Sequence, residues 1–376
     1  MEFMGQGGFV WWFGVVEDVD DPLKLGRVRV RIFGYNPENK KSLPTADLPW
    51  AHPLQDITSA SISGIGRTPT GIVAGSHVFG FFRDGLNAQQ PVVMFSVGGI
   101  PQEIADKKKG FNDPSGKYPT QEYIDAKHSD LNFLATGEKT DKTVIETRKK
   151  GKKKDVSVAL DSQDKEKWTE PDSPYKPKYP KNKVFATESG MVEEWDDTPG
   201  KERHHTYHPS GSFEEVANGW EKDPNGTRVH NVKGNNYEIV AGDDFIHIKG
   251  SARITIDGSS KIYIGAGEDK GDLNIQVDRD VNFYVTGNVR GTVEGNVDWK
   301  VKGNYREIIE GDKYSLVTGN SVTETDKNFV FKANGDGVFK TAGGSDLHLS
   351  GSSKAIKLNS PRATNSDPKA FRGDRL

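Results

Sequence analysis

The sequence predicts an all-β protein in which a small barrel or sandwich precedes an elongated, intertwined triple-stranded β-helix. Short strand-like segments separated by turn residues fill roughly the first hundred residues. An eight-residue pattern, in which an aliphatic residue is followed two positions later by glycine, dominates the C-terminal part. Only 33% of the residues are hydrophobic and 42 of 376 are glycine, which disfavours one large core and fits an extended repeat architecture.

The composition excludes several classes of protein. The chain contains no cysteine, so we expect neither disulfides nor thiolate metal sites. Its formal net charge of −3 gives no overall attraction to nucleic acid or to an anionic membrane. No apolar run of about 18 residues is present, so we expect no transmembrane helix. The start of the chain has no positive region before an apolar stretch and therefore predicts no signal peptide.

Residues 1–100 are predicted to form one β domain. Arginines alternate with Val28, Val30 and Ile32, which places the three aliphatic side chains on one face of a strand and the arginines on the other. Further strands are predicted at residues 12–16, 50–52, 77–82 and 91–97. Such a series of short strands indicates a small barrel or sandwich.

Two features of this domain suggest interactions. Arg27, Arg29 and Arg31 form a basic stripe, but residues 1–100 contain 8 Lys/Arg and 9 Asp/Glu, so we expect a solvated face or a protein interface and no nucleic acid. The aromatic run from Val10 to Phe13 is predicted to be partly core and partly a docking surface, because exposed aromatic residues mark interfaces.

Residues 101–183 are predicted to be an extended, Lys/Pro-rich linker. They contain the basic block 148–154 and the proline-stiffened stretch 173–180, and they show helical periodicity over no more than one or two turns. We expect a solubilising tether that lies against the rest of the protein.

The strongest pattern in the sequence is an octad repeat over residues 232–352. From Val285 to Val317, each octad begins with an aliphatic residue and continues with a glycine two positions later. The same phase extends upstream to Val232, with one insertion near 265–271, and downstream, where Lys327 breaks the rule, to Gly351. The predicted inward-facing aliphatic residues are Val232, Val240, Ile248, Ile256, Ile264, Val277, Val285, Val293, Val301, Ile309 and Val317. The predicted corner glycines, expected to supply positive φ angles, are Gly234, Gly242, Gly250, Gly258, Gly287, Gly295, Gly303, Gly311, Gly319, Gly335, Gly343 and Gly351.

An octad holds one short strand and one corner, and a single chain with this pattern cannot enclose a core. Three chains wound together can each form one face of a triangular prism, with the aliphatic residues meeting at its axis. Strands of neighbouring chains then pair their backbones. The repeat therefore predicts an obligate homotrimer. A disordered glycine-rich tract has no reason to keep a fixed phase, and a calcium-binding nonapeptide roll requires a period of nine.

Three further segments carry a resemblance to a known family. They are residues 12–31 with the sequence DPLKLGRVRVR, residues 110–119 with GFNDPSGKYP, and residues 187–216 with DDTPGKER and HPSGS. Together with the octads, they resemble the central spike of contractile-tailed phage baseplates of the T-even type and, more distantly, the VgrG spikes of type VI secretion. The resemblance implies an OB-fold in residues 1–100 that docks on a trimeric hub, and a collar at 184–231 where the spike begins.

The chain departs from the T-even pattern in one respect. In that pattern a lysozyme domain lies between the OB-fold and the helix, but only about 65 residues separate Pro119 from Val184 here, and a lysozyme-type domain needs a larger core. No set of catalytic acids is recognisable in this stretch. We therefore expect that the protein is not an enzyme.

Metal sites are weak candidates. His204, His205 and His208 do not have the spacing of a metal motif. Some spikes of the family bind iron at the apex through a repeated His-x-His pair, but here the position two residues before His348 is Asp346. Three copies of His348 on the axis are still a candidate iron site at the tip, and we expect no other cofactor.

The resemblance implies a structural, cell-puncturing spike in the virion, located in the baseplate and assembled in the host cytoplasm. Its implied partners are two further copies of the chain, the trimeric hub at the end of the tail tube and the host outer membrane. A PAAR-type tip protein is a further implied partner beside the tip segment 353–376. The alternatives are a VgrG-like secretion spike and a glycan-binding or glycan-degrading tailspike, which would need aromatic platforms or paired carboxylates on long loops.

Overall fold

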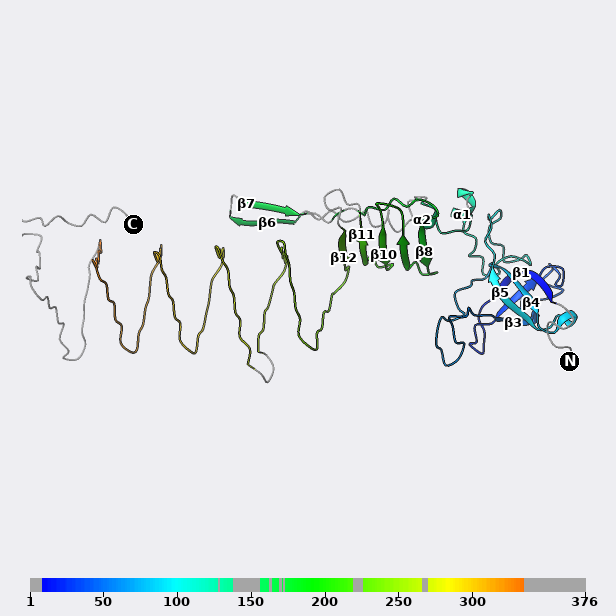
Figure 1. The fold of residues 1–376 in the computed structure, drawn as a ribbon, viewed down its shortest axis with the longest axis horizontal. Coiled ribbons are helices and arrows are strands. Elements are labelled where there is room, and N and C mark those ends of the chain that lie inside the picture. The colour runs from blue at the N-terminus through cyan, green and yellow to red at the C-terminus, as the bar shows by residue number, and fades with distance from the viewer. Residues whose placement is uncertain are drawn as a thin grey trace, which may run out of the picture. The chain divides into compact units, whose positions relative to one another are not determined.

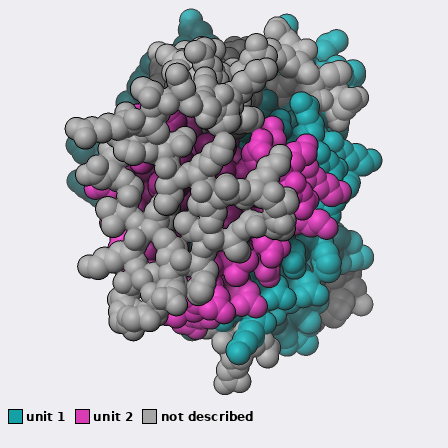
Figure 2. Space-filling model, turned by 90° about the vertical axis from the view of Figure 1, so that its left-hand side faces the viewer, with its two compact units in different colours: residues 1–288 teal, residues 289–376 magenta. Residues whose placement is uncertain are grey.

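The computed structural model describes residues 9–127, 129–137, 156–161, 164–168, 171, 173–218, 226–265 and 270–334. The chain divides into two units, residues 1–288 and residues 289–376 (Figure 2). Within the described residues, no helix combines the length and the apolar character that crossing a bilayer requires.

The N-terminal part of the first unit is a closed five-stranded barrel (Figure 1). Its strands are β1 (Val10–Asp18), β2 (Val28–Ile32), β3 (Trp50–Pro53), β4 (His77–Phe82) and β5 (Pro91–Ser96), with 3₁₀ turns η1 (Thr45–Asp47) and η2 (Gly85–Asn87). They pair in the order β1-β2-β3-β5-β4 and close through β4 and β1. Only the β3–β5 pair is parallel among the pairings described. The predicted small barrel is thus confirmed as OB-like.

The barrel interior follows from the period-two alternation of its strands. Trp12 and Val16 of β1, Val28, Val30 and Ile32 of β2, and Val78 and Phe82 of β4 are all buried in one cluster. Gly80 lies where a Cβ would come within 2.1 Å of the Val92 carbonyl oxygen and 2.5 Å of the Trp12 ring. The indole therefore packs against bare backbone, which explains the glycine at the centre of β4.

The segment after the barrel contains more regular structure than the predicted linker. It forms the short helices α1 (Gln121–Ala126) and α2 (Phe133–Thr136) and the hairpin β6 (Val156–Asp161) with β7 (Asp164–Trp168). Asn132 caps α2, because its side-chain oxygen accepts from the Leu134 N–H at 2.9 Å. Helices this short have no sequence periodicity to detect, and tertiary packing stabilises them instead.

A second sheet, which we call the collar sheet, follows in the first unit. Its strands are β8 (Asn182–Ala186), β9 (Val192–Asp196), β10 (Arg203–Tyr207), β11 (Phe213–Ala217) and β12 (Thr227–Asn231). Each strand pairs antiparallel with its sequence neighbours. Leu134 and Tyr175 cover one face and pack against Val192, whereas the described chain leaves the other face open.

From Val232 onward the described residues, which we call the repeat region, form no helix and no paired strand. The backbone bends at regular intervals, and Figure 1 shows open, repeated turns. Bends at 233–234, 241–242, 249–250 and 257–258 are eight residues apart, and the same spacing recurs from 278–279 to 326–327. The bends therefore coincide with the octads, including 326–327, where Lys327 replaces the glycine.

Candidate functional site

The repeat region presents a row of aliphatic side chains that this chain does not cover. The eleven predicted inward-facing residues, from Val232 to Val317, are between 37% and 59% exposed. Most other large apolar residues of the octads are more exposed still, and Trp299 is 85% exposed. Exposed apolar surface of this extent is uncommon on a protein that works as one chain, and it marks an interaction surface.

The corner glycines from Gly234 to Gly319 lie at the bends, but the prediction that they adopt positive φ angles is wrong. From Gly234 to Gly319, none of these glycines has a positive φ angle; Gly265, in the inserted loop, has one of 68°. A Cβ built on any of the corner glycines from Gly234 to Gly319 would meet nothing within 4 Å in the single chain. Neither backbone conformation nor contacts within the chain therefore require glycine here.

The barrel carries a second uncovered surface, which we call the aromatic face. Alternation along β1 buries Trp12 and turns Trp11 and Phe13 outward. Trp11 and Phe13 each contact the Phe79 ring of β4, with centroids 5.2 and 5.0 Å apart. Phe9 stacks on Trp11. Phe95 of β5 is the register partner of Phe79 on the neighbouring strand β4. The five rings thus cover three adjacent strands without an intervening charge.

The predicted solvated arginine face does not exist as such. The guanidinium of Arg31 is fully buried and forms a two-pronged ion pair with Glu17, at 2.7 and 3.0 Å. It also donates to the carbonyl oxygens of Pro37 and Leu43, so the loop after β2 covers it. Arg27 pairs with Asp21 at 2.7 Å. These arginines hold loops onto the barrel, a role that strand alternation alone does not reveal.

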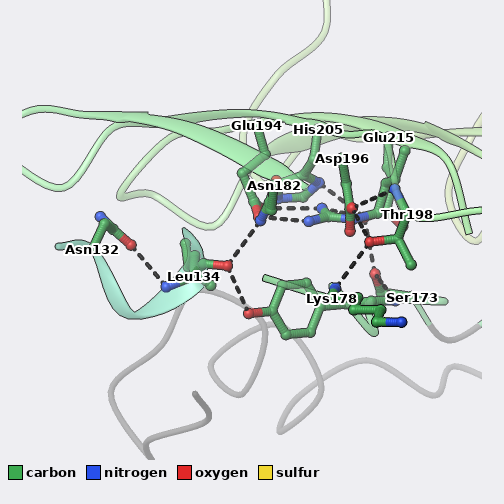
Figure 3. A network of polar contacts seen from close by, with 12 residues as sticks. Asn132, Leu134, Ser173, Lys178, Asn182, Glu194, Asp196, Thr198, His205 and Glu215 are labelled. Atoms are coloured by element: carbon green, nitrogen blue, oxygen red, sulfur yellow. Dashed lines mark hydrogen bonds and ion pairs between the residues drawn. The ribbon is translucent and has the colours of Figure 1, made fainter. Parts of the chain in front are cut away.

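The covered face of the collar sheet contains a buried ionic cluster, formed by Glu194, Arg203, His205 and Glu215 (Figure 3). These side chains come from β9, β10 and β11, and all four are fully buried. Arg203 donates to Glu194 at 2.5 Å and to Glu215 at 3.2 Å. Burial opposes the charge on Arg203, but the two carboxylates outweigh it and raise the pKa of the guanidinium.

Polar groups of the covering segment complete this cluster. Ser173 donates to Glu215 at 2.9 Å, and Asn182 donates to Glu194 at 2.7 Å. The carbonyl oxygen of Leu134 accepts from Asn182 and from the Tyr175 hydroxyl (Figure 3). Leu134 of α2, Ser173 and Tyr175 are therefore bonded to one another and to the collar sheet by specific contacts, which stabilise charges that would be costly to bury alone.

The histidines do not converge. Alternation along β10 sends His205 into the buried cluster and His204 to the open face. The Nδ1 atom of His205 is 3.1 Å from Glu215, close enough for an ion pair but not aligned for a hydrogen bond. Among the described residues no group of three or more His, Cys, Asp or Glu side chains is arranged to hold a metal ion. His348, Gly335, Gly343 and Gly351 lie outside the described residues.

A cavity of about 470 Å³ lies between the barrel and the following segment, lined among others by His77, Ile100, Phe111, Asp113 and Tyr118. Burial favours a raised pKa for Asp113, but the carboxylate accepts hydrogen bonds from Ser115, Tyr118 and Lys117, and the net effect lowers the pKa. This carboxylate therefore closes the loop of the GFNDPSGKYP segment and is committed to structure.

The sequence is similar to that of known proteins. The family described as the Gp5 N-terminal OB domain matches residues 35–175. Protein Gp5 of Vibrio phage KVP40 is 39% identical over 265 residues, which cover 63% of this chain and 61% of the relative. The pre-baseplate central spike protein Gp5 of Enterobacteria phage T4 is 46% identical over 114 residues, 29% of this chain and 20% of the relative. The chain thus spans less than two thirds of either relative, and the resemblance predicted from the sequence is confirmed.

Sequence reasoning missed the buried ionic cluster. The sequence holds a weak signal in one strand, because period-two alternation places Glu215 on the same face as Phe213 and Ala217. Charged residues are seldom fully buried, so such positions are assigned to the solvent face unless a partner is known.

Proposed function

We propose that this chain, whose sequence is similar to the central spike proteins of T4-like phage baseplates, forms a homotrimeric, cell-puncturing spike at the tip of a contractile tail. The repeat regions of three copies wind into a triple-stranded β-helix. The row from Val232 to Val317 lies at its axis, and strands of different chains pair their backbones. The shaft transmits axial force from tail contraction into the host outer membrane.

One observation carries the proposal: the repeat region keeps a regular eight-residue geometry although it has no strand partner and no core of its own. Ordering a backbone costs roughly 1–2 kcal/mol per residue, and a single chain offers nothing here to offset that cost. Two further copies of the repeat region, wound between the turns of the first, supply both missing contributions. These are hydrogen bonds between the strands of different chains and apolar contacts at the axis.

The barrel docks the spike on the trimeric hub of the baseplate. The aromatic face fits this role, because four of its five rings are exposed, Phe79 is half-buried among them, and all five are uncharged, as at the centre of protein–protein interfaces. The relative from phage T4 is named a pre-baseplate central spike protein, which supports a place in the baseplate of the virion. Assembly in the host cytoplasm belongs to the same proposal.

The spike acts mechanically and not as an enzyme. The charged side chains that gather in the first unit are committed to structure: Glu194 and Glu215 are fully buried against Arg203, and Glu17 against Arg31. A PAAR-type protein at the tip and an iron ion bound by His348 belong to the same proposal. A VgrG-like secretion spike is the nearest alternative, since it shares the architecture.

Sedimentation equilibrium of the purified chain tests the trimer. We expect a mass three times the chain mass of 41.5 kDa over a wide range of dilution, with a species on unheated SDS gels that heating dissociates. A folded particle of 41.5 kDa would overturn the proposal. Release of peptidoglycan fragments by the purified protein would overturn its non-enzymatic part.

A further inference from the structure

His205 of β10 is a fully buried histidine on the covered face of the collar sheet (Figure 3). The strand register places it between Glu194 of β9 and Glu215 of β11. Its Nδ1 atom is 3.1 Å from a carboxylate oxygen of Glu215. The rings of Tyr207 and Phe213 lie beside the imidazole, with centroids 6.4 and 5.8 Å away, so solvent screens the charges around His205 only weakly.

The groups around His205 carry more negative than positive charge. Among the described residues, the other titratable or charged side chains buried or half-buried on this face are Glu194, Asp196, Glu215, Arg203, Tyr175 and Tyr207. Strand β8 contributes the neutral side chain of Asn182, and Lys176 and Lys178 of the covering segment are exposed. If His205 and both tyrosines are neutral, three buried carboxylates share one buried cation, and an excess of buried charge is costly.

A proton on a carboxylate or on the imidazole would reduce this excess, and the hydrogen bonds favour the imidazole. Glu215 accepts from Ser173 at 2.9 Å and from Arg203 at 3.2 Å. Asp196 accepts from the N–H and the hydroxyl group of Thr198, at 3.0 and 2.6 Å. An ionised carboxylate is purely an acceptor, so these contacts suit ionised acids. Imidazole is also the stronger base, since the ordinary pKa of histidine is about 6.5 and that of glutamate about 4.3.

We infer that His205 is an imidazolium ion in the folded protein at neutral pH and serves, with Arg203, as the second cation of the buried ionic cluster. Both cations then belong to the central strand β10, and the carboxylates that face them belong to its two neighbours, β9 and β11. The proton on His205 stabilises the covered face of one chain and does not depend on the homotrimer.

This charge makes the stability of the collar sheet depend on pH with a definite sign. In an unfolded chain a histidine loses its second proton near pH ~6.5, whereas the folded collar keeps the proton to higher pH. The stabilisation is therefore complete below about pH 6.5 and is lost as the pH rises further. While the folded state holds one proton more than the unfolded state, the equilibrium constant for opening the sheet increases about tenfold for each pH unit.

Amide hydrogen exchange of the full-length chain from about pH 5.5 to about pH 9 tests the inference, with protection of the β9–β11 amides as the measurement. At each pH, wild type is compared with His205→Arg, which carries a permanent charge, and with His205→Gln, which carries none, so the intrinsic pH dependence of exchange cancels. His204→Gln is the matched control, because His204 is on the same strand but exposed on the open face, 3.3 Å from Glu193.

At about pH 6 we expect wild type and His205→Arg to be protected alike and His205→Gln to be protected less. Above about pH 6.5 the protection of wild type should fall about tenfold per pH unit relative to His205→Arg. It should fall in the same way relative to His205→Gln until the two are equal. The comparison with His205→Gln decides the outcome even if arginine does not fit the buried position.

A protection ratio of wild type to His205→Gln that declines with rising pH, together with a constant ratio to His204→Gln, supports the inference. A ratio to His205→Gln that stays constant or increases with pH would overturn it, because the folded state would then hold no more protons at this residue than the unfolded state. A decline confined to the ratio to His204→Gln would place the titrating charge on the open face and overturn it as well.

Discussion

Up to Asn231 the described chain pairs its strands with one another and covers its own core, whereas from Val232 on it does neither. Both regions consist of short segments rich in aliphatic and aromatic residues, separated by turns or bends. The difference lies in the connections. In the collar sheet, turns such as 208–212 return the chain antiparallel to the preceding strand, but the bends of the repeat region send it onward.

This difference shows which kind of stability each region has. The barrel and the collar sheet contain their own hydrogen-bonded partners, so the pairing of their strands does not require a second copy of the chain. The repeat region has its partners only in other copies, so its order is linked to association. The predictions that follow try to break or sharpen this contrast, beginning with the largest expected effect.

The double substitution Val293→Asp with Val301→Asp should abolish the trimer. It would place two rings of carboxylates near the three-fold axis, where burial of unpaired like charges is very costly. Sedimentation equilibrium should then give the mass of one chain, and the SDS-resistant species should disappear. The matched control is Asn296→Asp with Asn304→Asp, which adds the same charge beside the bends and should leave the trimer intact. A trimer that survives the valine substitutions would show that the row does not face the axis.

Arg203→Met should destabilise the collar sheet by about 3–5 kcal/mol, because it leaves Glu194 and Glu215 buried without their shared cation. Amide hydrogen exchange in β9–β11 reports this loss separately from the stability of the repeat region.

Arg228→Ala is its control, since the Arg228–Glu214 pair is largely exposed in the single chain and screened by solvent, so its loss should change the stability of the collar sheet little. Equal protection of the β10 amides in Arg203→Met and wild type would contradict the role of the buried cluster.

The same comparison shows which features of the fold could be predicted from the sequence and which could not. The octads were recognisable because a fixed spacing of valine and glycine needs no knowledge of distant contacts. The barrel strands were recognisable because period-two alternation is local. The burial of Arg31 was predicted wrongly and that of Glu194 was not predicted at all, because it depends on partners 14 and 9 residues away in the chain. The positive φ angles predicted for the corner glycines were also wrong, because the requirement for glycine at these bends is not found within the single chain.

Protonation of Asp113 should lower the stability of the barrel and the segment that follows it at acid pH. Its pKa is lowered in the folded protein, so its contribution to stability is present above the unfolded pKa of about 3.9 and is lost as the pH falls through the lower folded value. Asp113→Asn should remove that part of the pH dependence. At neutral pH it should cost about 1–3 kcal/mol, because a buried carboxylate that accepts several hydrogen bonds is lost.

Thermal unfolding between pH 3 and pH 7 measures this effect. Unfolding curves with the same pH dependence in Asp113→Asn and wild type would contradict it. Asp56→Asn is a suitable comparison, because the pKa of Asp56 is also lowered, by hydrogen bonds from Thr58, but its carboxylate is exposed and its substitution should cost less.

The smallest effect is expected when a single methyl group is added to the repeat region, either at a bend or between two bends. Gly295 lies at a bend of the octad row and Gly291 between bends, and in the single chain a Cβ at either residue meets nothing within 4 Å. If contacts within one chain were the whole account, alanine at both positions would be neutral or would stabilise by about 0.4–1 kcal/mol through the unfolded state. A neighbouring backbone that passes close to each bend makes Gly295→Ala destabilising and leaves Gly291→Ala unaffected. The temperature at which the SDS-resistant trimer dissociates should therefore fall for Gly295→Ala alone, and equal values for the two variants would mean that the glycines recur for a reason other than close approach of the chains.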